Sequence, residues 1–221
     1  MRRTAPAEFV LAHTRVRHAP FVPEVRLHLA DDGPDGSIEL WESTQLAVNR
    51  GEIPPPFWAF VWAGGQALAR HLLDHPETVT GRRVIDVATG SGLVAIAAAQ
   101  AGAAEVLAYD IDEFAAAATR LNARLNAVTV IAVAAGVQSV EVDAGDVVTV
   151  GDVFYDERIA ALMVGELGRL ARAGAMVLVG DPHRAYLPTE RLRPVASYEV
   201  DVETDLEDAP VKPAVVAVLS G

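Results

Sequence analysis

Apolar residues along the chain fall into two alternating patterns, short continuous runs and longer runs with helical spacing. The short runs predict buried strands over residues 83–87, 106–109, 128–133, 147–150 and 176–179. The longer runs predict helices over residues 64–73, 93–101, 113–125 and 157–172. Strands that alternate with helices need crossover connections, so the pattern indicates an α/β protein with a mostly parallel sheet.

The alternation ends near the C-terminus. Residues 197–202 and 214–219 both read as strands, and no helical pattern separates them. The acidic segment 203–208 joins them, which predicts an antiparallel hairpin at the edge of the sheet. With this hairpin, we expect a seven-stranded, mostly parallel sheet with helices on both faces.

The first 55 residues predict a small N-terminal elaboration, which precedes a larger domain over residues 56–221. Residues 7–16 have the pattern of a short helix. Residues 24–29 and 37–41 read as strands on either side of a turn rich in Asp and Gly, a combination that predicts a hairpin.

Composition narrows the class of protein. The formal net charge is −12, so phosphate repels the chain, and we expect no nucleic-acid partner. The absence of cysteine excludes disulfides, cysteine metal sites and a thiol nucleophile. No apolar run reaches membrane-spanning length, and the six histidines form no metal-ligand motif. We therefore expect a cytoplasmic protein with no metal and no membrane contact, whose macromolecular partner offers a basic group.

Residues 84–99, VIDVATGSGLVAIAAA, predict a strand, a glycine turn and a helix. Gly90 and Gly92 allow the backbone to approach a ligand at the N-terminus of the helix, a device that serves dinucleotides and S-adenosylmethionine alike. Asp86 precedes the turn, where a carboxylate would repel pyrophosphate but suits the ammonium group of S-adenosylmethionine. The acid therefore favours S-adenosylmethionine as the cofactor.

A second acid follows the next predicted strand. Asp110 lies 18 residues after Gly92 and can accept hydrogen bonds from two ribose hydroxyls, as nicotinamide sites also require, so it does not discriminate between the cofactors. Ile111 then offers an apolar wall for adenine. Asp112 either belongs to the same site or caps the next helix.

Three further stretches fall at the sheet edge where α/β proteins bind ligands: residues 56–70 (PFWAFVWAGGQALAR), 151–157 (GDVFYDE) and 180–184 (GDPHR). Together with the glycine turn and the terminal hairpin, they resemble the Rossmann-like class I methyltransferases. More narrowly, they resemble the electron transfer flavoprotein β-subunit lysine methyltransferase family. Two departures from the family pattern are Ala63, where proline is common, and residues 134–136, where a polar residue often meets adenine.

The resemblance implies a role for each candidate residue. Asp152 and Tyr155 match a D-x-x-Y motif that positions the substrate lysine, and they are the expected catalytic residues. Trp58, Phe154 and Asp181 are the expected substrate-binding residues, with the aromatic faces suited to methylammonium. The expected contacts to S-adenosylmethionine come from Trp62, Asp86, Thr89, Gly90, Gly92, Asp110 and Ile111.

The function that this resemblance implies is methyl transfer from S-adenosylmethionine to lysine side chains of the electron transfer flavoprotein β subunit, by a monomer or weak dimer. Another protein, such as a ribosomal protein, or a small molecule is an alternative substrate. A nicotinamide-dependent oxidoreductase and an inactive domain that binds S-adenosylmethionine are alternatives from other classes.

Overall fold

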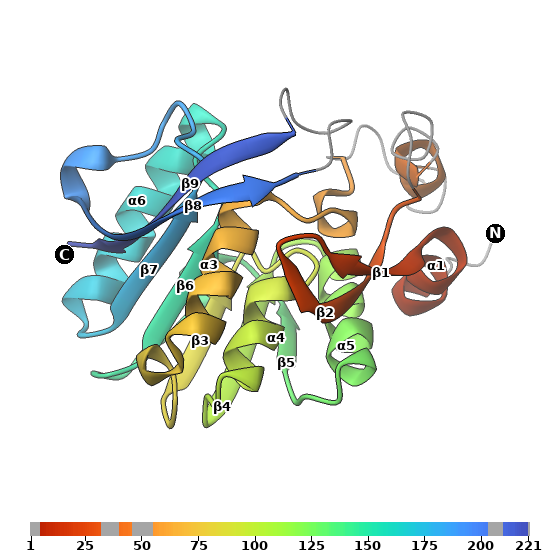
Figure 1. Cartoon of the computed structure of the whole chain (residues 1–221), viewed down its shortest axis with the longest axis horizontal. Helices are drawn as coiled ribbons and strands as arrows, with labels where there is room; N and C mark the ends of the chain where they lie inside the picture. Colours follow the sequence, from red (N-terminus) through yellow and green to blue (C-terminus); the bar gives the residue numbers. More distant parts are fainter. Residues whose placement is uncertain (1–4, 32–39, 46–54, 203–209, 221) are drawn as a thin grey trace.

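The structure is a computed structural model, and it describes residues 5–31, 40–45, 55–202 and 210–220. A seven-stranded sheet with the order β5-β4-β3-β6-β7-β9-β8 lies at its centre (Figure 1). Its strands are β3 (Arg83–Val87), β4 (Glu105–Asp110), β5 (Ile131–Ala134), β6 (Val147–Gly151), β7 (Met176–Asp181), β8 (Leu192–Asp201) and β9 (Val211–Leu219). β3 to β7 are mutually parallel, whereas β9 runs antiparallel to β7 and β8. The expected mostly parallel sheet with a terminal antiparallel hairpin is confirmed.

Helices cover both faces of this sheet (Figure 1). One face carries α3 (Ala63–Asp74), α4 (Leu93–Gln100) and α5 (Glu113–Leu125), and the other carries α6 (Glu157–Arg172). Strand β3 shows how alternate residues serve the two layers, since Val84 packs toward α4 while Ile85 packs toward α6. Because both faces are covered, the strands read as continuous apolar runs. Among the described residues, no helix is long and apolar enough to cross a membrane.

The N-terminal segment differs from the prediction. Helix α1 (Pro6–His13) ends early, and a strand, β1 (Arg15–Ala19), pairs antiparallel with β2 (Val22–Leu29). The predicted hairpin between residues 24–29 and 37–41 is therefore wrong, because β2 pairs with the preceding segment and residues 40–45 are helical. Residues 32–39 lie outside the described part of the chain.

This segment packs on the main domain rather than standing apart from it. Phe9 of α1 meets Phe114 of α5 edge to face, with ring centroids 5.1 Å apart. Asn122 of α5 accepts a hydrogen bond from the main-chain N–H of His28 in β2 at 2.7 Å. The N-terminal elements and α5 thus share a core, and the domain division at residue 55 stays a prediction.

Other boundaries shift for local reasons. Strand β5 begins at Ile131, three residues later than predicted, because the chain first has to close helix α5. Ala127 is left-handed at φ 56°, and the N–H of Val128 donates to the carbonyl of Ala123 at 3.0 Å. The acidic segment 203–208 that precedes β9 lies outside the described residues. Short 3₁₀ turns complete the chain: η1 (Phe57–Ala59), η2 (Pro76–Thr78), η3 (Val137–Ser139) and η4 (Thr189–Arg191).

Helix α3 approaches the ends of β6 and β7 so closely that only glycine fits between them. A Cβ atom on Gly64 would collide with the carbonyl of Gly180, and one on Gly180 would collide with the carbonyl of Gly64. A Cβ on Gly151 would lie 2.9 Å from the Cα of Gly65. These backbone contacts fix the N-terminus of α3 against the carboxyl ends of the two strands.

We predict that Gly64→Ala destabilises the protein and that Gly65→Ala does not. The added methyl at Gly64 meets backbone that cannot yield, so we expect a loss of about 1–3 kcal/mol or more. Gly65 has no atom within 4 Å of the added Cβ, so alanine there should be neutral or stabilise the helix by up to about 1 kcal/mol. Urea unfolding of the two variants measures the difference, and equal stabilities would contradict the proposed close contact.

Candidate active site

The glycine turn after β3 holds Asp86 in a closed polar cage. The carboxylate is buried, and its two oxygens accept hydrogen bonds from the hydroxyls of Thr89 at 2.5 Å and Thr149 at 2.8 Å. Thr149 comes from the neighbouring strand β6, opposite Asp86 in the register. Sequence reasoning missed Thr149, whose place beside Asp86 depends on strand order.

Burial sets the charge state of Asp86. Desolvation raises the pKa of this carboxyl to about 6, while the bonds from Thr89 and Thr149 lower it and the charge of Asp110 raises it. A cation that binds beside Asp86 would favour the ionised form. The site therefore suits the ammonium end of an amino acid.

The turn itself is shaped by backbone conformations that favour glycine. Gly90 and Gly92 have φ values of 52° and 85°, and a Cβ on Gly92 would lie 2.9 Å from the Thr119 methyl group. Helix α5 braces the turn, since Asn122 donates to the carbonyl of Ser91 at 2.8 Å and Thr119 donates to that of Gly90 at 3.3 Å. The sequence offered no local signal for these two supports.

Asp110, at the end of β4, faces the same turn. Its carboxylate accepts hydrogen bonds from the N–H groups of Gly90 at 3.0 Å and Asp112 at 2.9 Å. A carboxylate has about four acceptor positions, so it retains capacity for two ribose hydroxyls. Burial raises the pKa of this carboxyl as well. The Asp112 side chain caps α5 by accepting from the Phe114 N–H at 2.8 Å, which supports the capping alternative.

Ile111 is 82% exposed at the edge of the sheet, which is unusual for so large an apolar side chain. Its position next to Asp110 gives an apolar surface beside the buried Asp86 and the partly buried Asp110. A Cβ on Gly90 would lie in ordinary contact with the Cα of Trp58, 3.8 Å away. A carboxylate for an ammonium group, a second for hydroxyls and an apolar wall together fit S-adenosylmethionine.

A second group of side chains lies beyond β6 and β7. Asp152 follows β6 in a left-handed conformation with φ 55°, and its Oδ2 accepts from the Gly65 N–H of α3 at 2.8 Å. Its Oδ1 accepts from the Arg184 guanidinium at 3.0 Å. The Arg184 Cζ lies 5.9 Å from the ring centroid of Trp62, the N-cap residue of α3. Arg184 belongs to the stretch 180–184 that was predicted to lie at this edge, but the sequence pattern predicted no role for Arg184 itself.

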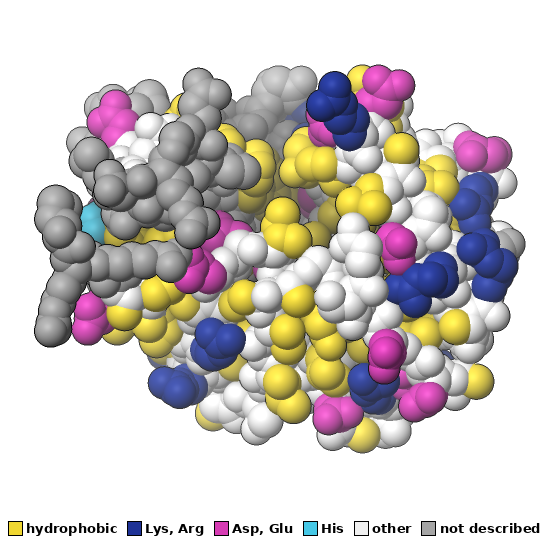
Figure 2. All heavy atoms as spheres, turned by 180° about the vertical axis from the view of Figure 1, so that it is seen from behind, with side chains coloured by type: hydrophobic (Ala, Val, Ile, Leu, Met, Phe, Trp, Pro, Cys, Tyr) yellow, Lys and Arg dark blue, Asp and Glu magenta, His cyan; other side chains and the backbone are white. Residues whose placement is uncertain are grey.

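Aromatic side chains extend from this corner to the surface. Phe57 packs against Trp62 and Tyr155, with ring centroids 5.8 and 5.7 Å away, and both Phe57 and Tyr155 are exposed. Burial and the charges of Asp156 and Asp110 raise the pKa of Tyr155, so its hydroxyl stays protonated at neutral pH. Figure 2 shows that hydrophobic side chains are exposed at many places on one face of the molecule, between charged side chains.

Two of the predicted substrate contacts lie in the core instead. Trp58 is buried and stacks on Phe114 with centroids 6.3 Å apart, and Phe154 is fully buried beneath α6. Both rings pack in the core in this structure, and their contact with a substrate stays a prediction. Trp62 and Tyr155, four and one residues further along the chain, remain accessible.

Asp181, which ends β7, is fully buried next to this corner. Its Oδ1 accepts from the main-chain N–H of Arg184 at 2.7 Å, and its Oδ2 has no hydrogen-bond partner among the described residues. Desolvation raises the pKa of this carboxyl to about 7, with a smaller contribution from the charge of Asp152. His183, which lies between Asp181 and Arg184 in the sequence, has a left-handed backbone conformation with φ 62°.

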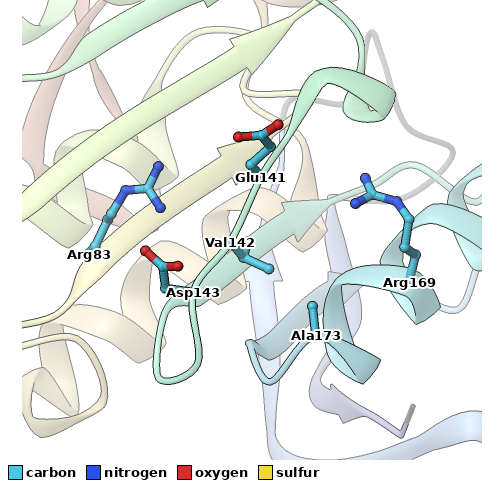
Figure 3. A pocket seen from close by; sticks show the side chains of 6 residues that line it. All are labelled: Arg83, Glu141, Val142, Asp143, Arg169 and Ala173. Atoms are coloured by element: carbon cyan, nitrogen blue, oxygen red, sulfur yellow. The ribbon is translucent and has the colours of Figure 1, made fainter.

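An open hollow lies at the opposite edge of the sheet. It measures about 450 Å³ and is lined by Arg83, Glu141, Val142, Asp143, Arg169 and Ala173 (Figure 3). Its arginines are already engaged, since Arg83 pairs with Asp146 at 2.8 Å and Arg169 with Glu166 at 2.8 Å. Over the described part of the chain, no group of three or more His, Cys, Asp or Glu could hold a metal ion.

Comparison with known proteins agrees with this arrangement. The magnesium protoporphyrin IX methyltransferase of Synechocystis, solved with S-adenosylmethionine, superimposes with a TM-score of 0.54 at 14% identity, over 86% of this chain and 87% of that one. A sequence model of the family "Ribosomal protein L11 methyltransferase (PrmA)" matches residues 67–157. The fold is that of the Rossmann-like, S-adenosylmethionine-dependent methyltransferases.

Relatives with higher sequence identity narrow the class from methyltransferases in general to one family. An electron transfer flavoprotein β subunit lysine methyltransferase of Xenopus laevis is 38% identical over 211 residues, which cover 93% of this chain and 83% of the relative. The human protein of the same name is 42% identical over 65% of this chain and 54% of its own length. The chain belongs to the electron transfer flavoprotein β-subunit lysine methyltransferase family. Membership of this family excludes the alternative function of a nicotinamide-dependent oxidoreductase.

We predict that S-adenosylhomocysteine binds more tightly as pH rises from 5 to 7. The free carboxyl of Asp86 has a raised pKa of about 6, and the ligand's ammonium requires the ionised form. Binding must therefore expel a proton at low pH, so affinity should change by about tenfold per pH unit well below pH 6 and level off above it. Isothermal titration calorimetry in buffers of different ionisation enthalpy measures both the affinity and the released proton.

Asp86→Asn should weaken binding and abolish the pH dependence. Asp112→Asn is the matched control, because asparagine also caps a helix and leaves Asp86 untouched. A pH dependence that survives Asp86→Asn would assign the proton to another group.

Proposed function

We propose that this protein transfers methyl groups from S-adenosylmethionine to a lysine side chain of the electron transfer flavoprotein β subunit. The family relatives carry that substrate in their names. The observation that carries the proposal is the corner between β6, β7 and α3. There the carboxylate of Asp152 and the aromatic face of Trp62 already contact a cation of the chain itself, the Arg184 guanidinium. A lysine ammonium needs the same two partners.

The negative net charge of the chain supports the proposal that the partner is a protein with exposed lysines. A net charge of −12 attracts a basic surface and raises the rate of encounter. The exposed rings of Phe57 and Tyr155 lie at the mouth of the same corner and provide apolar contact for the stem of the lysine.

The residues of the chain divide the chemical task between them. S-adenosylmethionine, when bound, supplies a methyl group on a positively charged sulfur. Asp86 and Asp110 hold the amino-acid and ribose ends of the cofactor, and Ile111 covers the adenine. Asp152 binds and orients the incoming ammonium, and the Tyr155 hydroxyl aligns the amine. Alignment of this kind contributes about 7–11 kcal/mol toward lowering a reaction barrier.

Lysine must lose a proton before its nitrogen can attack a methyl group. The aromatic walls lower the pKa of the lysine by desolvation. Asp181 is suited to take the proton from the ammonium onto its carboxylate, because a pKa of about 7 allows exchange near neutral pH. Its Oδ2 is buried without a hydrogen-bond partner in the described structure, so an ammonium that reached it would satisfy an unpaired acceptor.

A ribosomal protein substrate is less well supported. The match to the L11 methyltransferase model ends at residue 157 and omits both β7 and the terminal hairpin. The matched segment holds the cofactor half of the site with Asp152 and Tyr155, but it lacks Trp62, Asp181 and Arg184.

We predict that the wild-type protein labels purified electron transfer flavoprotein β subunit with radioactive S-adenosylmethionine and leaves ribosomal protein L11 unlabelled. Asp152→Asn should reduce kcat/KM by about a hundredfold, because the ammonium loses its oriented charge partner. The affinity for S-adenosylhomocysteine should stay unchanged, because Asp152 belongs to the amine half of the site.

Asp156→Asn is the matched control for this variant. It lies four residues further along, where asparagine preserves the cap of α6. No label on the β subunit would overturn the substrate assignment, and an unchanged kcat/KM in Asp152→Asn would overturn the role of Asp152.

A further inference from the structure

Arg184 occupies the corner that the proposed function assigns to the substrate. Its guanidinium contacts the carboxylate of Asp152 at 3.0 Å and lies over the ring of Trp62 at 5.9 Å. Its main chain is anchored separately, because the N–H donates to Asp181 at 2.7 Å. The side chain is thus the part that can move while the loop after β7 stays in place.

The surroundings leave little room for a second cation. The Asp152 side chain is only 7% exposed, and its other oxygen is engaged by the Gly65 N–H. The Arg184 side chain is 24% exposed and lies on the solvent side of the pair. Two cations at one partly desolvated carboxylate would also repel each other.

We propose that Arg184 is a built-in competitor for the substrate-ammonium subsite, and that the incoming lysine displaces its guanidinium from Asp152 and Trp62. This inference rests on the proposed function for the identity of the lysine donor. The subsite itself is defined by the three side chains and accepts any primary alkylammonium of lysine-like size.

Exchange of one cation for another avoids the main cost of opening a buried ion pair. Removal of Arg184 alone would leave Asp152 buried without a counter-charge, which is strongly unfavourable. A protonated lysine restores that charge as it enters, and Arg184 regains water at the surface. A neutral side chain cannot make this exchange. Arg184 therefore makes the subsite selective for a cationic side chain and occupies the subsite until one binds.

Arg184→Met tests the proposal because it removes the charge and keeps an unbranched apolar stem over Trp62. If Arg184 fills the subsite most of the time, its removal should lower the KM for the β subunit about tenfold or more, with little change in kcat. Arg184→Lys retains a competing cation and should keep a KM near the wild-type value. Arg193→Met, an exposed position on β8 with the same change in net charge, should behave as wild type.

Binding of n-butylammonium, a lysine side-chain analogue, tests the subsite without any methylation. It should raise the melting temperature of Arg184→Met at about a tenth of the concentration that wild type requires. The double variant, with both Asp152→Asn and Arg184→Met, should show no such rise in melting temperature. If the β subunit is not a substrate but butylammonium still binds Arg184→Met selectively, the proposed function fails and the subsite stands.

Other outcomes overturn the proposal. A lower kcat in Arg184→Met that Arg184→Lys restores would make Arg184 a fixed support for Asp152. A shift of the pH profile to higher pH in Arg184→Met would mean that Arg184 stays beside the lysine and lowers its pKa. Should the variant not fold, nitrogen NMR of the wild-type Arg184 guanidinium decides: release on addition of a lysine peptide supports displacement, and an unchanged signal with peptide bound contradicts it.

Discussion

The backbone contact between α3 and the ends of β6 and β7 is the constraint on which the site depends. Gly64 and Gly180 approach so closely that neither position has room for a side chain. This contact brings the N-terminus of α3, and with it Trp62, against the loop that carries Asp152. The amine half of the site is therefore built by glycine packing, while the cofactor half is built by the turn after β3.

Backbone strain gathers at the same edge. Ala88, Asp152 and His183 are left-handed non-glycine residues, and each lies one or two positions beyond the end of β3, β6 or β7. Such conformations cost about 1–2 kcal/mol each and persist where the surrounding structure imposes them. The fourth described example, Ala127, closes α5. Strain at three neighbouring strand ends supports a functional role for this edge.

Local sequence signals predicted the elements that local physics determines. The parallel strands, the glycine turn with Asp86 and the terminal hairpin were predictable from apolar runs and turn residues. The pairing of β1 was not, because three of its five residues are Arg or His and the strand packs at the surface. The roles of Arg184 and Thr149 were not predicted, because their contacts join loops or strands that are far apart in the sequence. The spacing of the tryptophans also could not show that Trp58 is buried whereas Trp62 is accessible.

A structure of the protein with S-adenosylhomocysteine and a lysine peptide from the electron transfer flavoprotein β subunit tests the account most directly. We predict that the lysine nitrogen lies within hydrogen-bond distance of the Asp152 carboxylate and over Trp62. The cofactor sulfur should face that nitrogen across the gap left for a methyl group, with Asp86 next to the cofactor ammonium. A lysine that enters elsewhere, with Asp152 and Trp62 making no contact to it, would contradict the account.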